Sequence, residues 1–259
     1  MDFKIIQPDK SISLFVKNIL VFEEQEKTKN TTLPFFADGY PGLMFQDTEN
    51  GLFVQPYNKK MPCFFLYGQT INPIELEIKG SYKLIVFQLY PFILKSFFGI
   101  SAIDINDSCY DLKQVDDGEI TIKNVLKTNQ LEKRIEIITN FLFAIFRVKQ
   151  QSLDFTIKQA IQIVLDNQGQ ISIKEVCDKT HLTKRTFERR FLNETGISAK
   201  QFSKIIQFQH SLEQLTLKEF KKLTDIVYNN GFADQSHFIR VFKAFTRKTP
   251  KNFLSKLTK

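Results

Sequence analysis

The sequence has few of the residues from which disulfide frameworks and metal sites are built. Its three cysteines are widely spaced and odd in number, which fits reduced cytoplasmic thiols better than a disulfide framework: Cys63, Cys109 and Cys177. All three histidines lie in the C-terminal half: His181, His210 and His237. Because metal sites in β-barrels generally draw on imidazole ligands, we expect residues 1–152 to bind no metal, and we expect no cofactor.

Long apolar runs and catalytic signatures are also missing. The longest apolar stretch, residues 84–94, contains Gln88 and Pro91 and is much shorter than the roughly 20 residues that cross a bilayer. Residues 1–4 lead into mixed polar sequence, unlike the basic flank and apolar run of a signal peptide. The sequence contains no G-x-S-x-G motif, phosphate-binding glycine loop or paired-cysteine zinc spacing. We therefore expect no membrane association and no enzymatic activity.

Positive charge is concentrated in one half of the chain. Residues 153–259 hold 19 Lys and Arg against 10 Asp and Glu, a net charge of +9, whereas residues 1–152 hold 17 against 18 and have a net charge of −1. A basic surface suits a polyanionic partner, but charge alone does not separate DNA from an anionic membrane. The length and the ordinary globular composition, 42% hydrophobic and 25% charged, favour two domains.

An internal repeat decides between these partners. Residues 180–202 and 231–253 share a spaced pattern at an offset of fifty-one positions. The matching pairs are Thr183 with Asp234, Phe187 with Phe238, Arg189 with Arg240, Phe191 with Phe242, Ser198 with Thr249 and Phe202 with Phe253. Two similar units with arginine at the same place predict two elements that read DNA.

Each repeat has the local signals of a helix. Thr183 and Asp234 precede apolar periodic segments, where their side-chain oxygens can accept the first unpaired backbone N–H groups. Phenylalanines four residues apart place one face of each helix in the core. The side chains left outside can bind base edges or phosphates: Lys184, Arg185, Glu188 and Arg189 on the first helix, and Gln235, Ser236, His237 and Arg240 on the second.

A short helix is expected before each of these helices. Ser172 and Glu175 form an S-x-x-E capping box that begins a helix ending near Thr180. Residues 223–229 are the corresponding helix of the second unit, and Gly231 allows the positive φ of a helix end. A helix, a tight turn and a second helix form a helix-turn-helix motif, whose second helix enters the major groove.

The segment from about residue 153 to 259 resembles the DNA-binding module of AraC/XylS-type transcription regulators. The resemblance is carried by Gly231, Phe232, Phe238, Arg240, Phe242, Lys243, Thr249 and Pro250, preceded by the unit at residues 183–196. It implies two helix-turn-helix units joined by a long helix over residues 199–217, which read two adjacent major-groove segments. The sequence departs from the family at three positions: Arg247 replaces a usual glycine, Gln207 replaces a usual arginine, and Ser211 is the small residue of the joining helix.

Carried over by position, the base-reading residues of the family fall on Arg185, Glu188 and Arg189 and on Ser236, His237 and Arg240. Arg can bond guanine through O6 and N7, and Glu can accept from the amine of cytosine. For Glu188 an i, i+4 ion pair with Lys184 is an alternative of equal weight to the contact with cytosine. His237 could instead be a helix-start residue that contacts phosphate, and Lys243 is expected to contact phosphate whatever the sequence.

The N-terminal half has the pattern of a β domain. Between residues 33 and 112, short apolar segments alternate with Gly, Pro and Asn breaks: residues 42–45, 52–54, 63–67, 74–78 and 84–89. We expect a β-sandwich or jelly roll over residues 1–115, similar to the cupin-like sensors of the same family, followed by an all-α domain. The overall class is therefore α+β and multidomain. The sequence does not identify effector-binding residues in the β domain. The aromatic residues of this domain belong more often to a core than to the lining of a pocket: Phe35, Phe36, Tyr40, Phe64 and Tyr67.

Residues 116–150 are expected to be a helical segment between the domains. Apolar residues recur at helical spacing along one face: Leu131, Ile135, Ile138, Leu142, Ile145 and Phe146. This face either packs on the β domain or pairs with its copy in a homodimer. The polar residues 147–152 are the expected linker, and the DNA-binding domain then covers residues 153–259.

The sequence thus predicts a transcription regulator that binds specific sequences of double-stranded DNA, located in the cytoplasm at the nucleoid. A small-molecule effector of the N-terminal domain, RNA polymerase and a second copy of the chain are further candidate partners. One alternative is a DNA-binding or partner-recruiting protein without a ligand. A more remote one is a DNA-repair enzyme with the same module, which would need a zinc-held cysteine cluster that the distant Cys63 and Cys109 do not offer.

Overall fold

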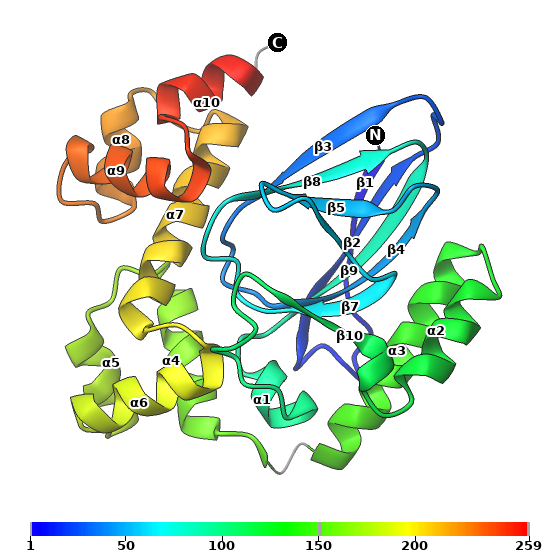
Figure 1. The fold of residues 1–259 in the computed structure, drawn as a ribbon. Coiled ribbons are helices and arrows are strands. Elements are labelled where there is room, and N and C mark those ends of the chain that lie inside the picture. Colours follow the sequence, from blue (N-terminus) through cyan, green and yellow to red (C-terminus); the bar gives the residue numbers. More distant parts are fainter. Residues whose placement is uncertain (1, 150–151, 258–259) are drawn as a thin grey trace.

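The computed structural model describes residues 2–149 and 152–257. A β domain made from the N-terminal half lies beside a helical domain made from the C-terminal half (Figure 1). All strands are antiparallel with their neighbours and form two sheets. The six-stranded sheet has the order β1 (Asp2–Ile6), β2 (Val16–Glu24), β9 (Tyr82–Leu89), β4 (Gly42–Thr48), β7 (Phe64–Tyr67) and β10 (Cys109–Asp111). The four-stranded sheet has the order β3 (Asn30–Phe35), β8 (Ile74–Lys79), β5 (Leu52–Gln55) and β6 (Lys59–Lys60).

The buried face of each strand explains why the sheets stack. In β8 the side chains alternate, and Leu76 and Ile78 point into a cluster between the sheets with Met44, Phe65 and Val86. Burying alternate apolar residues of two facing sheets is the driving force of a β-sandwich. The predicted β-sandwich followed by a helical domain is confirmed.

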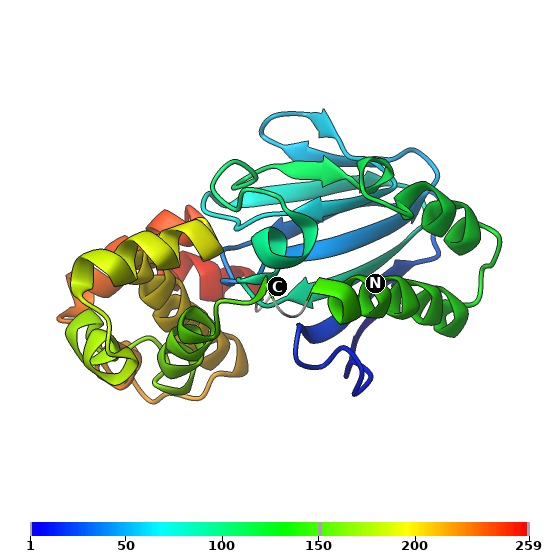
Figure 2. The same cartoon turned by 90° about the horizontal axis from the view of Figure 1, so that it is seen from below.

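The six-stranded sheet is covered on its other face by helices. The segment after β9 forms α1 (Ile93–Phe98), and after β10 come a short 3-10 helix (Leu112–Gln114), α2 (Gly118–Leu126) and α3 (Leu131–Lys149). Ile138, Leu142 and Phe146 of α3 are buried in the same cluster as Phe45 and Phe87 of the sheet. The apolar face of α3 therefore packs within its own chain, and α2 and α3 lie on the side of the β domain away from the helical domain (Figures 1 and 2).

The expected linker was partly wrong. Helix α3 continues through Lys149, so residues 147–149 are its last turn rather than a linker. Gln150 and Gln151 lie outside the described residues. The Ser152 hydroxyl lies within hydrogen-bond distance of two carbonyl oxygens, that of Ser96 at 2.9 Å and that of Lys149 at 2.6 Å. The chain thus enters the helical domain in contact with α1.

The helical domain contains seven of the described helices: α4 (Phe155–Asp166), α5 (Ile173–Thr180), α6 (Lys184–Thr195), α7 (Ala199–Leu217), α8 (Leu223–Asn229), α9 (Gln235–Thr246) and α10 (Pro250–Leu257). Helix α7 joins the pair α5–α6 to the pair α8–α9, as the sequence predicts. The capping box of Ser172 and Glu175 is present at the start of α5, and Gly231 after α8 has φ +69°.

One cluster of buried residues runs across both domains. It includes Phe97 of α1, Phe191 of α6, Phe202 of α7 and Phe242 of α9. Gly39 of the β domain lies so close to α7 that a Cβ there would be 3.0 Å from the Phe202 ring. The two domains are therefore packed together along a shared apolar surface.

Candidate nucleic-acid interface

Helices α6 and α9 begin in the same way. The Thr183 hydroxyl accepts a hydrogen bond from the backbone N–H of Thr186 at 3.4 Å, and the Asp234 carboxylate accepts one from the N–H of His237 at 2.6 Å. Both are N-caps that satisfy an otherwise unpaired donor of the first turn. The predicted caps are confirmed, and they fix where each exposed N-terminal turn starts.

The same inner face is buried in both helices. Phe187 and Phe191 of α6 and Phe238 and Phe242 of α9 are each at most 1% exposed. The distance between ring centroids is 5.5 Å for the pair in α6 and 5.7 Å for the pair in α9. The prediction that these phenylalanines are core residues is confirmed, and each helix is thereby held with its polar face outward.

The two helices also end in the same way, which the sequence reading missed. The Thr195 hydroxyl donates at 2.9 Å to the carbonyl of Phe191 and also lies 2.9 Å from the carbonyl of Ile197. The Thr246 hydroxyl makes the corresponding contacts to Phe242 and Lys248 at 2.8 and 2.9 Å. These threonines are also fifty-one residues apart, so comparing the repeat copies at every position would have found them.

After each threonine the chain adopts a left-handed conformation. Gly196 has φ +80°, and its counterpart Arg247 has φ +58°. Glycine adopts this conformation without a steric penalty, whereas another residue pays roughly 1–2 kcal/mol. The departure of Arg247 from the usual glycine therefore keeps the turn, and it leaves an exposed guanidinium at the end of α9.

The structure places most of the predicted site residues on exposed faces. The exposed ones are Lys184, Arg185, Glu188 and Arg189 of α6, and Gln235, Ser236, Arg240 and Lys243 of α9. Three of them, Ser236, Arg240 and Lys243, line one shallow hollow with Ile239. Each helix thus presents a polar outer face with a central arginine.

Two of the predicted residues have particular surroundings. His237 is half-buried, its ring meets the Phe232 ring edge-on at 5.6 Å, and its Nδ1 lies 3.4 Å from the backbone N–H of Ala233. For Glu188, the described residues include no ion pair with Lys184 within 4.0 Å. Both side chains of that pair are directed to solvent.

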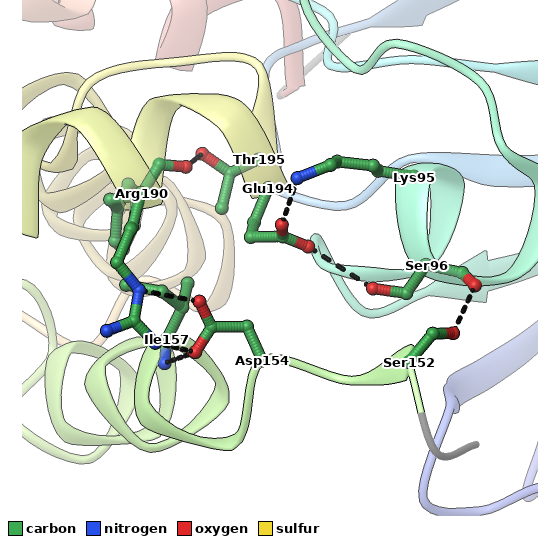
Figure 3. Close-up of polar contacts among 9 residues, drawn as sticks. Lys95, Ser96, Ser152, Asp154, Ile157, Arg190, Glu194 and Thr195 are labelled. Carbon is green, nitrogen blue, oxygen red and sulfur yellow. Dashed lines mark hydrogen bonds and ion pairs between the residues drawn. The ribbon is translucent and has the colours of Figure 1, made fainter.

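A second arginine of α6 has a different role. Arg190 donates from Nε and Nη2 to the two carboxylate oxygens of Asp154 at 2.8 and 2.5 Å (Figure 3). Burial of Asp154 favours the neutral acid, but the hydrogen bonds from Arg190 hold the pKa of this carboxyl below its ordinary value. Asp154 also caps α4 by accepting from the N–H of Ile157. Arg190 therefore joins α6 to α4, while its neighbour Arg189 remains exposed.

The sequence reading also missed Glu194 in the last turn of α6. It is 6% exposed and pairs with Lys95 of α1. The counterparts of Arg190 and Glu194 in α9 are Val241 and Phe245, both buried. A charged residue at a position where the other copy of the repeat has a buried apolar residue indicates a specific ionic partner. Aligning the two copies of the repeat would have shown this difference.

The β domain contains a mainly apolar cavity of about 60 Å³ between its sheets. Phe35 and Tyr67, two of the aromatic residues considered above, line it together with Met44, Phe65 and Leu76. Phe64 and Tyr40 are buried core residues. The Tyr67 hydroxyl is buried and has no hydrogen-bond partner within the described part of the chain, and burial raises the pKa of this phenol well above its usual value.

Comparisons with known proteins agree with this geometry. The family described as a helix-turn-helix domain matches residues 176–256, which run from α5 into α10. The HTH-type transcriptional activator RhaS of Yersinia pestis is 30% identical over 83 residues, which are 32% of this chain and 30% of RhaS. Residues 176–256 are therefore a helix-turn-helix domain. The predicted resemblance is thereby confirmed for this part of the chain.

Other similarities cover different shares of the chain. An uncharacterized HTH-type transcriptional regulator of Staphylococcus aureus is 28% identical over 83 residues, 32% of this chain, and the match spans only 11% of that relative. Residues 4–111 match a domain of unknown function, DUF6597. The solved structure of ToxT from Vibrio cholerae is 16% identical in sequence, with an alignment that covers 100% of each chain and a TM-score of 0.49. None of the helices in residues 2–149 and 152–257 combines the length and the apolar composition of a bilayer-spanning segment.

Proposed function

We propose that the protein is a transcription regulator that binds a specific sequence of double-stranded DNA through α6 and α9. The observation that carries this proposal is the structural repeat within the helix-turn-helix domain. Both helices have a side-chain N-cap, a buried phenylalanine pair and a terminal threonine at matching positions, and an exposed arginine at the same place, Arg189 and Arg240. Such helices place their N-terminal residues against base edges in the major groove.

The exposed side chains divide by chemistry into two groups. Arg185, Arg189 and Arg240 can each bond O6 and N7 of guanine, and Glu188 can accept from the amine of cytosine. Gln235 and Ser236 suit base edges, whereas Lys184, His237 and Lys243 suit phosphates. The excess of Lys and Arg in residues 153–259 supports phosphate binding, which releases condensed counterions and makes the affinity dependent on salt.

The β domain is proposed as the regulatory part. Residues 1–115 would form this domain, residues 116–150 a helical extension of it and residues 153–259 the DNA-binding domain. A ligand changes activity only by its differential affinity for two arrangements of the domains, and the apolar cavity between the sheets is a place where one could bind. A crystal structure of ToxT is described as bound to an unsaturated fatty acid, which is a property of that protein.

Further partners are part of the proposal. A regulator at a promoter would contact RNA polymerase, and a second copy of the chain is a candidate partner. The buried side chains of α3, which include Ile138 and Leu142, are taken up by packing on the β domain, so a homodimer would need another surface. The alternative of a ligand-free DNA-binding protein is favoured if no metabolite in a library shifts the melting temperature of the full chain.

Selection of binding sites from random duplexes tests the function. The wild-type chain is expected to enrich one sequence with two conserved segments. Arg189→Ala is expected to relax the preference in one segment and Arg240→Ala in the other, each at a cost of roughly 1–3 kcal/mol at the selected site.

Lys243→Ala is the matched control among the cations of α9, because a phosphate contact carries no base preference. It is expected to weaken binding to all sequences alike. Enrichment of no sequence by the wild type, or full preference retained in the Arg189→Ala and Arg240→Ala double variant, would refute the proposal.

A further inference from the structure

Helix α6 is held from two sides. It packs on α4, α5 and α7 of its own domain and also on α1 of the β domain. At its last turn, the Glu194 carboxylate accepts from Lys95 Nζ at 2.5 Å and from the Ser96 hydroxyl at 3.2 Å (Figure 3). Both donors belong to α1, so a recognition helix is bonded directly to the β domain.

The residue that ends α6 is bonded to the β domain as well. Asn106 Nδ2 donates to the carbonyl oxygen of Gly196 at 2.6 Å. A Cβ at Gly196 would lie 2.4 Å from the carbonyl oxygen of Ala102, so no residue other than glycine fits here without a backbone shift. The contact between the end of α6 and the β domain is therefore both polar and sterically close.

The charge of Glu194 is unfavourable in its own helix. The C-terminal end of a helix carries partial negative charge, which disfavours an acidic residue in the last turn. Glu194 is also almost fully buried, and a buried carboxylate without a partner is costly. Lys95 removes both penalties, because its ammonium group neutralises the carboxylate at the helix end.

The face of α6 proposed to meet DNA is not covered by this contact. Arg185, Glu188 and Arg189 remain exposed, while Glu194 in the last turn of the same helix is buried and paired with Lys95 of the β domain. The docked arrangement therefore leaves the reading side chains free.

The joining helix α7 and the C-terminal helix α10 meet the β domain at other places. Gln209 of α7 donates to the carbonyl of Ala37, and the ring of Phe253 in α10 lies 6.1 Å from that of Phe36. By contrast, the hydrogen bonds donated by Lys95, Ser96 and Asn106 are accepted at the end of the first helix-turn-helix unit. Loss of these bonds should therefore act on α6 more than on α9.

We propose that Lys95, Ser96 and Asn106 of the β domain are positioning residues for the recognition helix α6, acting through Glu194 and Gly196. The contacts from the β domain then help to hold α6 in the position from which it binds DNA. A change of state in the β domain that moves α1 would alter reading of one half of the site. This inference rests on the proposed DNA binding.

The test compares four variants of the full chain on a selected duplex by fluorescence anisotropy. Lys95→Met and Glu194→Gln remove the ion pair, and the double exchange Lys95→Glu with Glu194→Lys restores it in reverse. Lys123→Met is the matched control, because Lys123 pairs with Glu119 on α2 at 2.9 Å in an exposed place away from the helical domain. The half-site read by α6 is the one whose preference Arg189→Ala abolishes.

Lys95→Met and Glu194→Gln should each weaken DNA binding roughly tenfold, which corresponds to about 1.4 kcal/mol. The preference should fall in the half-site of α6 and persist in that of α9, the exchanged pair should recover most of the affinity, and Lys123→Met should bind like the wild type. Recovery by the exchanged pair is a readout that general destabilisation would not produce.

Three results would overturn the inference while leaving DNA binding intact. They are unchanged binding in Lys95→Met and Glu194→Gln, tighter binding in these variants, and an equal loss in both half-sites with no recovery in the exchanged pair. Absence of DNA binding by the wild-type chain would instead overturn the proposed function, so the two failures are distinguishable.

Discussion

Substitution of Gly196 by alanine should destabilise the protein much more than the same change at Gly99. Both glycines end a helix, and both have a left-handed backbone, with φ of +80° and +68°. Alanine in this conformation costs roughly 1–2 kcal/mol, and the lower entropy of its unfolded chain returns about 0.4–1 kcal/mol. A Cβ at Gly99 would meet nothing within 4 Å, so we expect a net loss of about 1 kcal/mol in the free energy of unfolding for Gly99→Ala.

At Gly196 the added Cβ would lie 2.4 Å from the carbonyl oxygen of Ala102 and 2.6 Å from its carbon. Both are backbone atoms, so α6 and the β domain would have to move apart. Forcing an extra carbon into a packed place costs typically 1–3 kcal/mol, which brings the expected loss for Gly196→Ala to roughly 3 kcal/mol. Urea unfolding followed by circular dichroism measures both values. Equal losses in the two variants would show that α6 and residue 102 are not in contact in solution and would refute the reasoning.

Three further predictions concern the caps, pH and salt. Thr183→Ala and Asp234→Ala should each lower the free energy of unfolding by about 1 kcal/mol, because the caps of α6 and α9 lose a hydrogen-bond acceptor, whereas Thr183→Ser should be nearly neutral. Calorimetry of the three variants measures these differences, and an equal effect of serine and alanine at position 183 would contradict the prediction. Burial raises the pKa of Asp38 to about 6, so the folded state holds this proton more tightly than the unfolded chain does. The resulting stabilisation is present below about pH 4 and is lost as the pH rises through 6, and urea titrations should show that Asp38→Asn lacks this decrease. Lys243→Ala should reduce the slope of log K against log salt by about 1, and an unchanged slope would exclude its phosphate contact.

The helical domain could be predicted closely because its signals are local. Caps at Ser172, Thr183 and Asp234 and phenylalanine pairs at helical spacing give the positions of α5, α6 and α9, and the repeat gives their relation. The contacts of Arg190 and Glu194 were missed because their partners, Asp154 and Lys95, are distant in sequence. Only the mismatch with apolar residues in the second copy pointed to them.

The β domain was predicted in outline. The strands β4, β5, β7, β8 and β9 are apolar and bounded by turn residues, so their existence followed from the sequence. Strand β1 was missed because it lies at the edge of its sheet with almost every side chain exposed, which removes the alternation. Helix α1 begins at the end of the apolar run that contains β9, where periodicity cannot separate a strand from a short helix. The last turn of α3 was taken for a linker because residues 147–152 are mostly polar.

The central claim is that α6 and α9 occupy two neighbouring segments of the major groove of one duplex. Dimethyl sulfate footprinting of the full chain on a selected site tests this most directly, because the reagent methylates guanine N7 in the major groove. We expect two protected segments on one face of the duplex, about one helical turn or 10–10.5 base pairs apart, with one lost in Arg189→Ala and the other in Arg240→Ala. A single protected segment that is unaffected by both substitutions would contradict it.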